Sequence, residues 1–201
     1  MKTERLTIRP IEESDWQSIQ KIWIDFNRSK YVIYDTYKNT DTEDVKKRIA
    51  KWEDATRNGK EHIFMVSCLK DLVIGFISLN IRMDGYEIGY GFLDQYQGKG
   101  YAKESLIAIF DYMKEQGVKK IYAGTAKNNL PSVGLLNSVG FQLVGTERIS
   151  FHKDSEGNDI YFEGGNFVKE LCCAASCVCQ FFVMVEKGRA VWTCYEKTGI
   201  D

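Results

Sequence analysis

Tyr96-Gln97-Gly98-Lys99-Gly100-Tyr101-Ala102 lies between a predicted strand and a predicted amphipathic helix. Gly98 and Gly100 have no side chains, so the backbone N–H groups of this stretch can approach a bound group closely. The N–H groups at the start of a helix have no partners within the helix, and together with the helix dipole they favour an anion. Lys99 adds a positive charge at the same place. The stretch therefore predicts a site for a pyrophosphate group.

Three other structures could carry the same glycine pattern. The dinucleotide-binding fingerprint G-x-G-x-x-G requires a third glycine at position 103, where this chain has Lys103. A phosphate-binding P-loop requires four residues between its glycines and a Gly-Lys-Ser/Thr end, and neither is present. A glycine-rich turn that binds no ligand stays open on the glycines alone.

The segments on either side alternate between strand and helix patterns. Thr40-Asp41-Thr42-Glu43 fits a capping box, and Asp84-Gly85 fits a two-residue hairpin turn. In chain order the predicted elements are a strand at 6–9, helices beginning near Ser14 and near Thr42, strands at 63–68, 72–79 and 86–90, a helix from 102 to about 117, a strand at 120–125, a helix at 131–139, and strands at 141–150 and 160–162. This order, β-α-α-β-β-β-α-β-α-β-β, predicts an α+β fold with a mixed sheet flanked by helices.

Length and charge fit one domain, with or without an appendage. The chain has 201 residues and a net charge of −1, so no overall basic field would attract nucleic acid. The N-terminal residues lack the apolar core and cleavage site of a signal peptide. The apolar run at 171–185 is shorter than the ~20 residues that a membrane helix needs. We therefore expect a cytoplasmic protein with no membrane and no nucleic-acid partner.

The composition changes after Leu171. Five of the six cysteines lie beyond it: Cys172, Cys173, Cys177, Cys179 and Cys194. Their spacing lacks the paired C-x-x-C of common zinc modules, so we predict no metal site and favour thiols that pack as small hydrophobic groups. We expect residues 1–171 to form the main domain and residues 172–201 a cysteine-rich extension, packed on that domain or at a homodimer contact.

Five short motifs, in register along the chain, resemble those of the GNAT superfamily of N-acetyltransferases. Gln97-x-x-Gly100-x-Ala102 is similar to its Q/R-x-x-G-x-G/A signature. The other four are Glu4-Arg5-Leu6-Thr7-Ile8-Arg9-Pro10, Glu87-Ile88-Gly89-Tyr90, Asn129-Leu130-Pro131-Ser132 and Gly140-Phe141. The first two of these resemble the branch that contains ribosomal-protein alanine N-acetyltransferases (the Rim branch). The resemblance implies a mostly antiparallel central sheet and a GNAT N-acetyltransferase domain at 1–171.

The resemblance also implies acetyl-CoA as a co-substrate, without a metal. In this family the strand before the phosphate site diverges from its neighbour, and the pantetheine arm pairs with it as an added strand. Backbone contacts would then come from Phe92, Leu93 and Asp94. Pyrophosphate contacts would come from the amides of Gln97, Gly98, Lys99, Gly100, Tyr101 and Ala102. Asn129 would bond the pantetheine arm, although it can equally cap the helix that follows, and both roles can coexist.

Acetyl transfer to an amine needs a base for the amine proton, a donor for the oxyanion and an acid for the leaving thiolate. Glu87 is the candidate base, with a solvated position or an ion pair with Arg82 as the alternatives. A backbone N–H near Phe92 is the candidate oxyanion donor. Many family members carry a tyrosine seven residues after the motif asparagine, but this chain has Leu136 there. Ser132 is the candidate to protonate or orient the thiolate, with a helix-start hydroxyl as the alternative.

The family's acceptor pocket draws on the N-terminal helical region. Tyr31, Tyr34 and Tyr37 lie in a predicted loop there and are candidates to line the pocket. His62 and His152 have no metal-like partners nearby in the sequence and are predicted to be ordinary strand or surface residues. We expect a primary amine as acceptor, either a protein N-terminus or a small amine such as a polyamine. The alternative function is a non-catalytic acyl-CoA sensor, which the leucine in the usual acid position keeps open.

Overall fold

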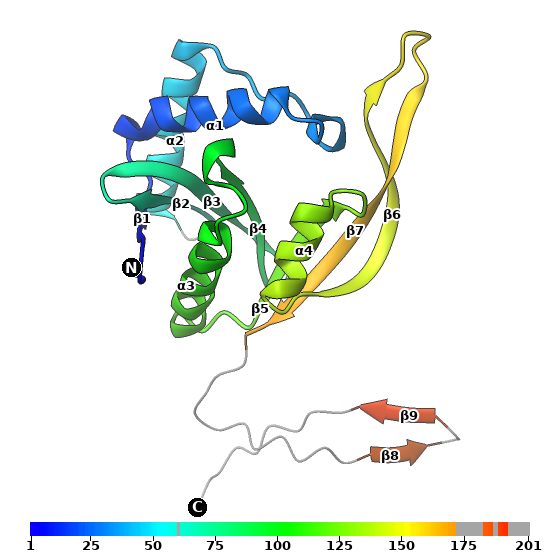
Figure 1. Ribbon diagram of the computed structural model, residues 1–201. Coiled ribbons are helices and arrows are strands. Elements are labelled where there is room, and N and C mark those ends of the chain that lie inside the picture. The colour runs from blue at the N-terminus through cyan, green and yellow to red at the C-terminus, as the bar shows by residue number, and fades with distance from the viewer. Residues whose placement is uncertain (60, 172–182, 187–188, 193–201) are drawn as a thin grey trace, which may run out of the picture. The chain divides into compact units, whose positions relative to one another are not determined.

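The computed structural model describes residues 1–59, 61–171, 183–186 and 189–192. The chain divides into two compact units, Met1–Leu171 and Cys172–Asp201. In the second unit, β8 (Val183–Glu186) pairs antiparallel with β9 (Arg189–Trp192). The five tail cysteines and the predicted packing or dimer contact of this extension lie outside the described residues, so its role stays a prediction. The first unit holds the sheet and the helices that form the candidate site (Figure 1).

Seven strands of the first unit form one sheet in the order β1-β2-β3-β4-β5-β7-β6. Their bounds are β1 Thr7–Pro10, β2 His62–Leu69, β3 Leu72–Arg82, β4 Gly85–Phe92, β5 Lys120–Ala126, β6 Gln142–Lys153 and β7 Asp159–Glu170. All neighbours are antiparallel except β4 and β5, which run parallel. The predicted mixed, mostly antiparallel sheet is confirmed, and so is the predicted order of strands and helices.

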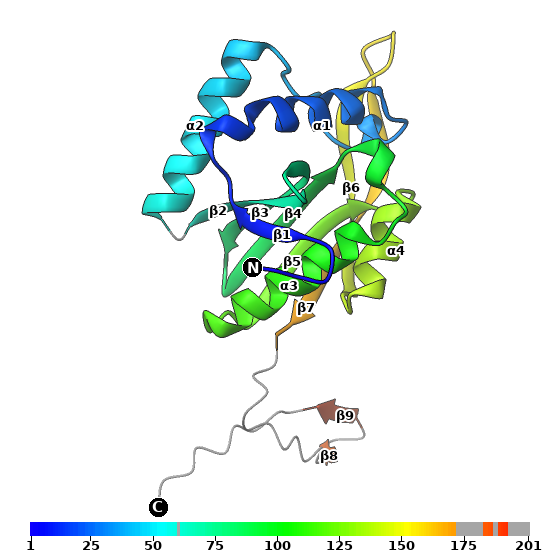
Figure 2. The ribbon, with the colours of Figure 1, turned by 60° about the vertical axis from the view of Figure 1, so that its left-hand side comes forward.

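Helices cover both faces of this sheet (Figure 2). Their bounds are α1 Trp16–Arg28, α2 Thr42–Asn58, α3 Tyr101–Glu115 and α4 Leu130–Ser138, with short 3-10 turns η1 Glu13–Asp15, η2 Val32–Tyr34 and η3 Asp94–Tyr96. Neighbouring side chains of a strand point to opposite faces. Accordingly, Phe64 and Val66 of β2 pack in the core under α1 and α2, whereas Met65 between them packs in the core under α3 and α4.

The hairpin between β3 and β4 turns one residue earlier than the sequence predicts. Arg82 pairs with Gly85, so the turn is Met83-Asp84 and not Asp84-Gly85. Met83 accordingly takes a left-handed φ of +48°. Gly85 belongs to β4 because a Cβ there would lie only 2.1 Å from the Lys120 carbonyl oxygen of β5. The glycine serves the close approach of two strands, which local turn chemistry does not reveal.

Two further predictions are corrected by the structure. The N-cap of α2 is Asp41, whose Oδ1 accepts hydrogen bonds from the backbone N–H groups of Glu43 (3.0 Å) and Asp44 (3.1 Å), so Thr40 does not start a capping box. β7 extends over twelve residues, well beyond the predicted 160–162. Its Gly164 and Gly165 have low intrinsic strand propensity, but β7 pairs with β5 on one side and β6 on the other, and this pairing overrides propensity.

The pairing between β4 and β5 positions the site. These two parallel strands pair only at Tyr86–Ile121 and Glu87–Tyr122. Beyond Glu87, β4 continues to Phe92 along β3, while β5 continues along β7. The two strands therefore diverge, and the edge of β4 that faces β5 is left open from Ile88 onward within the described part of the chain.

Candidate active site

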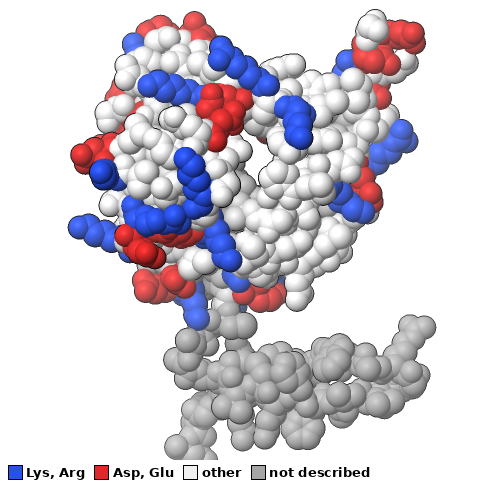
Figure 3. Space-filling view, viewed as in Figure 1, with Lys and Arg blue, Asp and Glu red and all other residues white. Residues whose placement is uncertain are grey.

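A cleft of about 1120 Å³ opens where β4 and β5 diverge. Its walls come from these strands, from the starts of α3 and α4, from the C-terminal half of α1, and from the loop at 29–38. In the space-filling view the middle of this face is hollowed and carries few charged side chains (Figure 3). A cleft of this size, formed by several elements, is large enough for an extended ligand.

The predicted phosphate cradle is the turn that leads into α3. Gly100 is the N-cap of α3 with a φ of +82°, and Gly98 has a φ of +69°, conformations that favour glycine. Gln97, Gly98, Gly100, Tyr101 and Ala102 line the cleft. The first N–H groups of α3 have no partners within the helix, so this wall of the cleft suits an anion.

Arg5, from the opening motif, holds the cradle from outside. Its Nη1 donates to the Lys99 carbonyl oxygen at 3.0 Å, its Nε donates to Glu104 at 2.7 Å, and its guanidinium lies 4.5 Å from the Tyr101 ring centroid. In a trans peptide the Gly100 N–H points opposite to the Lys99 carbonyl, and so away from Arg5. Lys99 thus shapes the cradle through its peptide group. Its ammonium lies 5.7 Å from the Tyr96 ring centroid, and Lys99 is not among the residues that line the cleft.

The end of β4 joins the cradle through a short hydrogen-bonded bridge. The Gln97 side-chain amide donates to the Phe92 carbonyl oxygen at 3.0 Å and to Asp94 Oδ1 at 2.9 Å, while the Leu93 N–H donates to Ile74 at 2.9 Å. Phe92 and Asp94 line the cleft, whereas the Leu93 side chain is buried in the core under α1 and α2. Of the three predicted contact residues, Phe92 and Asp94 therefore border the cleft, and the Phe92 carbonyl, the Leu93 N–H and the Asp94 N–H already have partners.

Asp94 is a carboxyl that lines the cleft and has a raised pKa. Burial raises the pKa of Asp94 above its ordinary value, and the neighbouring Asp25 carboxylate raises it further. The two are linked, since the Asp94 N–H donates to Asp25 Oδ2 at 3.2 Å. A carboxyl with a raised pKa is a candidate proton acceptor. However, Asp94 lies three residues before Gln97, at the phosphate end of the cleft.

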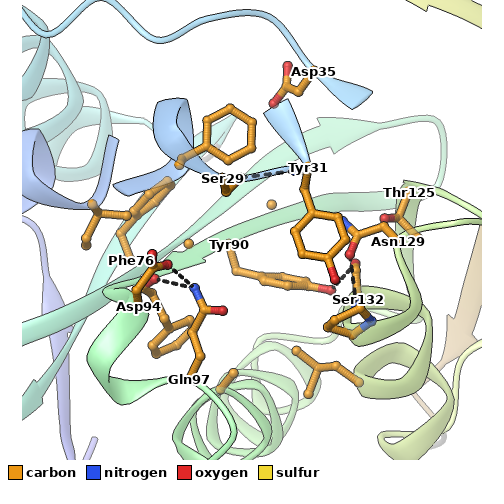
Figure 4. Close-up of a pocket in the computed structure, with 18 of the residues that line it drawn as sticks. Ser29, Tyr31, Asp35, Phe76, Tyr90, Asp94, Gln97, Thr125, Asn129 and Ser132 are labelled. Carbon is orange, nitrogen blue, oxygen red and sulfur yellow. Dashed lines mark hydrogen bonds between the residues drawn. The ribbon is translucent and has the colours of Figure 1, made fainter. Parts of the chain in front are cut away.

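Three polar side chains meet across the cleft from the cradle (Figure 4). Asn129 Oδ1 accepts from the Ser132 N–H at 3.4 Å, so Asn129 caps α4 while it also lines the cleft. The Ser132 hydroxyl lies 2.9 Å from the Tyr90 hydroxyl, which reaches it from β4. Burial raises the pKa of the Tyr90 phenol above its ordinary value, and the hydrogen bond to Ser132 partly opposes this rise. Leu136 is buried in the core under α3 and α4 and does not line the cleft.

Glu87 lies at the border of the cleft. Its Oε2 is 3.2 Å from Arg82 Nη1, with the two side chains 43% and 40% exposed, so the ion pair weighed from the sequence is present. Glu87 is not among the lining residues, but its Oε1 lies 3.8 Å from where a Cβ on Gly124 would stand, and Gly124 does line the cleft. The role of Glu87 as base stays a prediction.

The loop between α1 and α2 lines a further part of the cleft. Tyr31 and Tyr34 line the cleft, as predicted, but Tyr37 does not. The exposed Tyr37 ring packs against His152 of β6, with ring centroids 5.3 Å apart. His152 Nε2 lies 2.6 Å from the Asp35 carbonyl oxygen and 3.1 Å from that of Val32. His152 is therefore more than the ordinary strand residue that the sequence predicts, because it ties this loop to β6.

Comparison with known proteins identifies the family. The family profile described as "Acetyltransferase (GNAT) domain" matches residues 5–142. YnaD of Bacillus subtilis (strain 168), an uncharacterized N-acetyltransferase, is 31% identical over 163 residues, which cover 80% of this chain and 92% of YnaD. This chain belongs to the GNAT family of acetyltransferases. The predicted N-acetyltransferase is confirmed at this level.

Solved structures share the GNAT fold. The ribosomal-protein-S5-alanine acetyltransferase of Vibrio fischeri is 22% identical, with a TM-score of 0.70 over 85% of this chain and 95% of that one. The acetyltransferase yncA of Salmonella typhimurium, solved with acetyl-CoA, is 21% identical, with a TM-score of 0.65 over 86% of this chain and 98% of that one. At these identities the likeness is one of fold.

Loss of the His152 imidazole should free the loop between α1 and α2 of this GNAT domain. We expect His152→Ala to speed tryptic cleavage after Lys30 and Lys38 about five-fold, because the loop loses the one Nε2–H that its two carbonyl oxygens share, a contribution of roughly 1 kcal/mol net. Mass spectrometry of timed digests measures the rates. His62→Ala is the matched control, since exposed His62 bonds to Asn80 of β3 and not to the loop. Equal cleavage rates in both variants would contradict the anchoring role.

The motifs did not assign roles to three residues of the GNAT site. Arg5 and Tyr90 stand inside motifs that resemble the family, so a local signal was present, but their partners Lys99 and Ser132 come from distant parts of the chain. His152 had no local signal, because its contacts arise from the packing of β6 beside the loop. In the described part of the chain, no three His, Cys, Asp or Glu side chains are grouped to hold a metal ion.

Proposed function

We propose that this GNAT protein transfers the acetyl group of acetyl-CoA to a primary amine by direct attack on the thioester. The observation that carries the proposal is one cleft that joins an anion-binding helix start to the open edge of β4. A CoA thioester has both matching parts, a pyrophosphate and an amide-containing arm that can pair with a strand edge.

The residues of the cleft fit such a molecule. The amides of the cradle, Gln97–Ala102, would hold the pyrophosphate, with Arg5 fixing the turn. The open edge of β4 would pair with the pantetheine arm, while Phe92, Leu93 and Asp94 border its phosphate end and Asn129 stands across the cleft. The arm would run from the cradle back toward the start of β4, so the thioester would lie on the side of Tyr90 and Glu87.

The chemistry then divides between groups on either side of the thioester. An alkyl amine with a pKa around 10.4 arrives protonated at neutral pH, and we propose that Glu87 takes this proton, directly or through water. A backbone N–H of β4 near Phe92 would stabilise the oxyanion after attack. Ser132 stands on the leaving-group side. Asp94 suits the base role less well despite its raised pKa, because it lies at the phosphate end.

We propose that the acceptor is a protein N-terminus, with a small amine such as a polyamine as the alternative. The Rim-like motifs and the fold shared with the Vibrio fischeri ribosomal-protein alanine acetyltransferase support the first choice. Tyr31 and Tyr34 line the cleft, and we propose that an extended peptide end enters beside them. Function follows the pocket and not the fold, so the acceptor needs a direct test.

The test combines calorimetry with a free-thiol assay. Purified protein is titrated with acetyl-CoA and then incubated with acetyl-CoA plus either peptides that begin with alanine or spermidine. The proposal predicts micromolar binding and a release of CoA thiol that requires an amine. Binding without thiol release for any amine would favour the acyl-CoA sensor, and no binding by folded protein would overturn both functions.

Location and assembly stay predictions. Among the helices of the described residues, none is long and apolar enough to cross a membrane. We propose a cytoplasmic protein, and a homodimer through the cysteine-rich extension is an expectation that sedimentation of the full chain would test.

A further inference from the structure

The GNAT cleft needs a proton donor for the leaving thiolate, and the usual position does not supply one. The Leu136 side chain has no acidic group, and it is buried in the core at 1% exposure. Ser132 is a hydroxyl beside the cleft, but an alkyl hydroxyl is a poor acid. A donor must therefore come from another element that faces the same cleft.

Tyr90 of β4 has a phenol hydroxyl that lies at the cleft and can donate a proton. It is two residues beyond Ile88, where β4 loses its pairing with β5, so its side chain stands where the two strands diverge. Its ring packs against the buried cluster that contains Phe92, and its hydroxyl lies 2.9 Å from the Ser132 hydroxyl of α4. The phenol therefore spans from the open strand edge to the start of α4.

The position of Tyr90 along β4 also agrees with a place beside the thioester. Strand residues advance about 3.3 Å each, so Tyr90 lies roughly 7 Å before Phe92, where β4 ends next to the phosphate end of the cleft. An arm that leaves the cradle and runs back along β4 passes Phe92 first and reaches Tyr90 further from its phosphates. Figure 4 shows the Tyr90 hydroxyl and Ser132 together in the cleft, away from Asp94 and Gln97.

We propose that Tyr90 is the catalytic acid that protonates the departing CoA thiolate, and that Ser132 is a positioning residue that holds the phenol and returns its proton. This inference rests on the proposed acetyl transfer. It assigns the acid to a strand residue in a chain whose α4 helix carries leucine in the family's usual acid position.

The protons balance when the one that Glu87 takes from the ammonium is released from Glu87 to solvent. After Glu87 has accepted one proton from the ammonium, the neutral nitrogen forms the C–N bond and the C–S bond breaks. Tyr90 gives its hydroxyl proton to the sulfur, so CoA leaves as a thiol. The new amide nitrogen carries one surplus proton, and Ser132 relays it to the Tyr90 oxygen. The side chains Tyr90 and Ser132 end in the state in which they began.

The electrostatics of the phenol support this role. Burial raises the pKa of Tyr90 above its ordinary value, so the hydroxyl is protonated at neutral pH and has a proton to give as the C–S bond breaks. The same burial destabilises both the thiolate and the phenolate, and the Ser132 hydrogen bond stabilises the phenolate that the transfer leaves behind.

The test uses Tyr90→Phe, which removes the hydroxyl and keeps the ring. We expect kcat to fall about 100-fold, the effect typical of removing a general acid, while the dissociation constant for acetyl-CoA changes less than about three-fold. Kinetics with acetyl-CoA and the best amine from the thiol assay measure the first, and calorimetry measures the second. Tyr161→Phe is the matched control, because Tyr161 is exposed on β7 and lies outside the cleft.

Ser132 variants test the relay. Ser132→Ala should lower kcat about 10-fold without raising KM for acetyl-CoA, Ser132→Thr should restore most of it, and Ser132→Ala should cost little more in a Tyr90→Phe background. A Tyr90→Phe enzyme that keeps kcat within about three-fold of wild type would overturn the assignment and leave acetyl transfer standing. Absence of thiol release by the wild-type chain would instead overturn both.

Discussion

Gly100→Trp is expected to weaken acetyl-CoA binding by at least about 100-fold. Gly100 takes a φ of +82°, and a Cβ there would stand 3.3 Å from Arg5 Nη2, so a large side chain must displace either Arg5, which holds the cradle, or the turn itself. Either outcome removes the backbone N–H groups that would hold the pyrophosphate, and the remaining contacts cannot replace an anion site at a helix start. Calorimetry with acetyl-CoA measures the loss.

Gly157→Trp separates the loss of the cradle from the strain of the substitution. Gly157 has a φ of +87°, close to that of Gly100, and a Cβ there would have no neighbour within 4 Å. It lies in the turn between β6 and β7, outside the residues that line the cleft. Acetyl-CoA affinity should be unchanged in this variant. Tight binding by a folded Gly100→Trp protein would show that the glycine turn is not the phosphate site.

Glu87→Gln is expected to lower kcat by about 100-fold while leaving acetyl-CoA affinity nearly unchanged. The substitution keeps the size of the side chain and removes its ability to accept the amine proton, and general-base removal typically costs about 10² to 10⁴ in rate. Steady-state kinetics with the best amine acceptor, beside calorimetry with acetyl-CoA, separates the rate effect from binding.

Glu163→Gln is the matched control for the ion pair that Glu87 also makes. Glu163 is a strand residue of β7, 54% exposed and 3.0 Å from Lys127, much as Glu87 is 43% exposed and 3.2 Å from Arg82. Exposed pairs of this kind contribute little to stability, so neither variant should melt much earlier than wild type. If Glu87→Gln kept full kcat, the Arg82 ion pair would be the whole role of Glu87.

Most elements of this GNAT fold follow from local sequence patterns. Alternation and helical periodicity act over a few residues, and they predicted the order of strands and helices that the structure has. The exceptions are positions whose secondary structure depends on pairing with strands that are distant in the sequence. Gly85 reads locally as a turn residue but lies in β4 against the Lys120 carbonyl, and Gly164 and Gly165 read as a strand end but are paired on both sides.

The candidate site divides in the same way. The glycine turn from Gln97 to Ala102 follows from its own sequence, because the glycines, the helix start and the preceding strand are contiguous. Asn129 as a cap of α4 is equally local. The Tyr90–Ser132 hydrogen bond joins residues 42 positions apart, and the His152 contact with Asp35 joins residues 117 apart. Such pairs depend on how β4 and β5 diverge and on how β6 packs beside the α1–α2 loop, and only the tertiary structure decides that, because side-chain spacing within one segment carries no information about its distant partner.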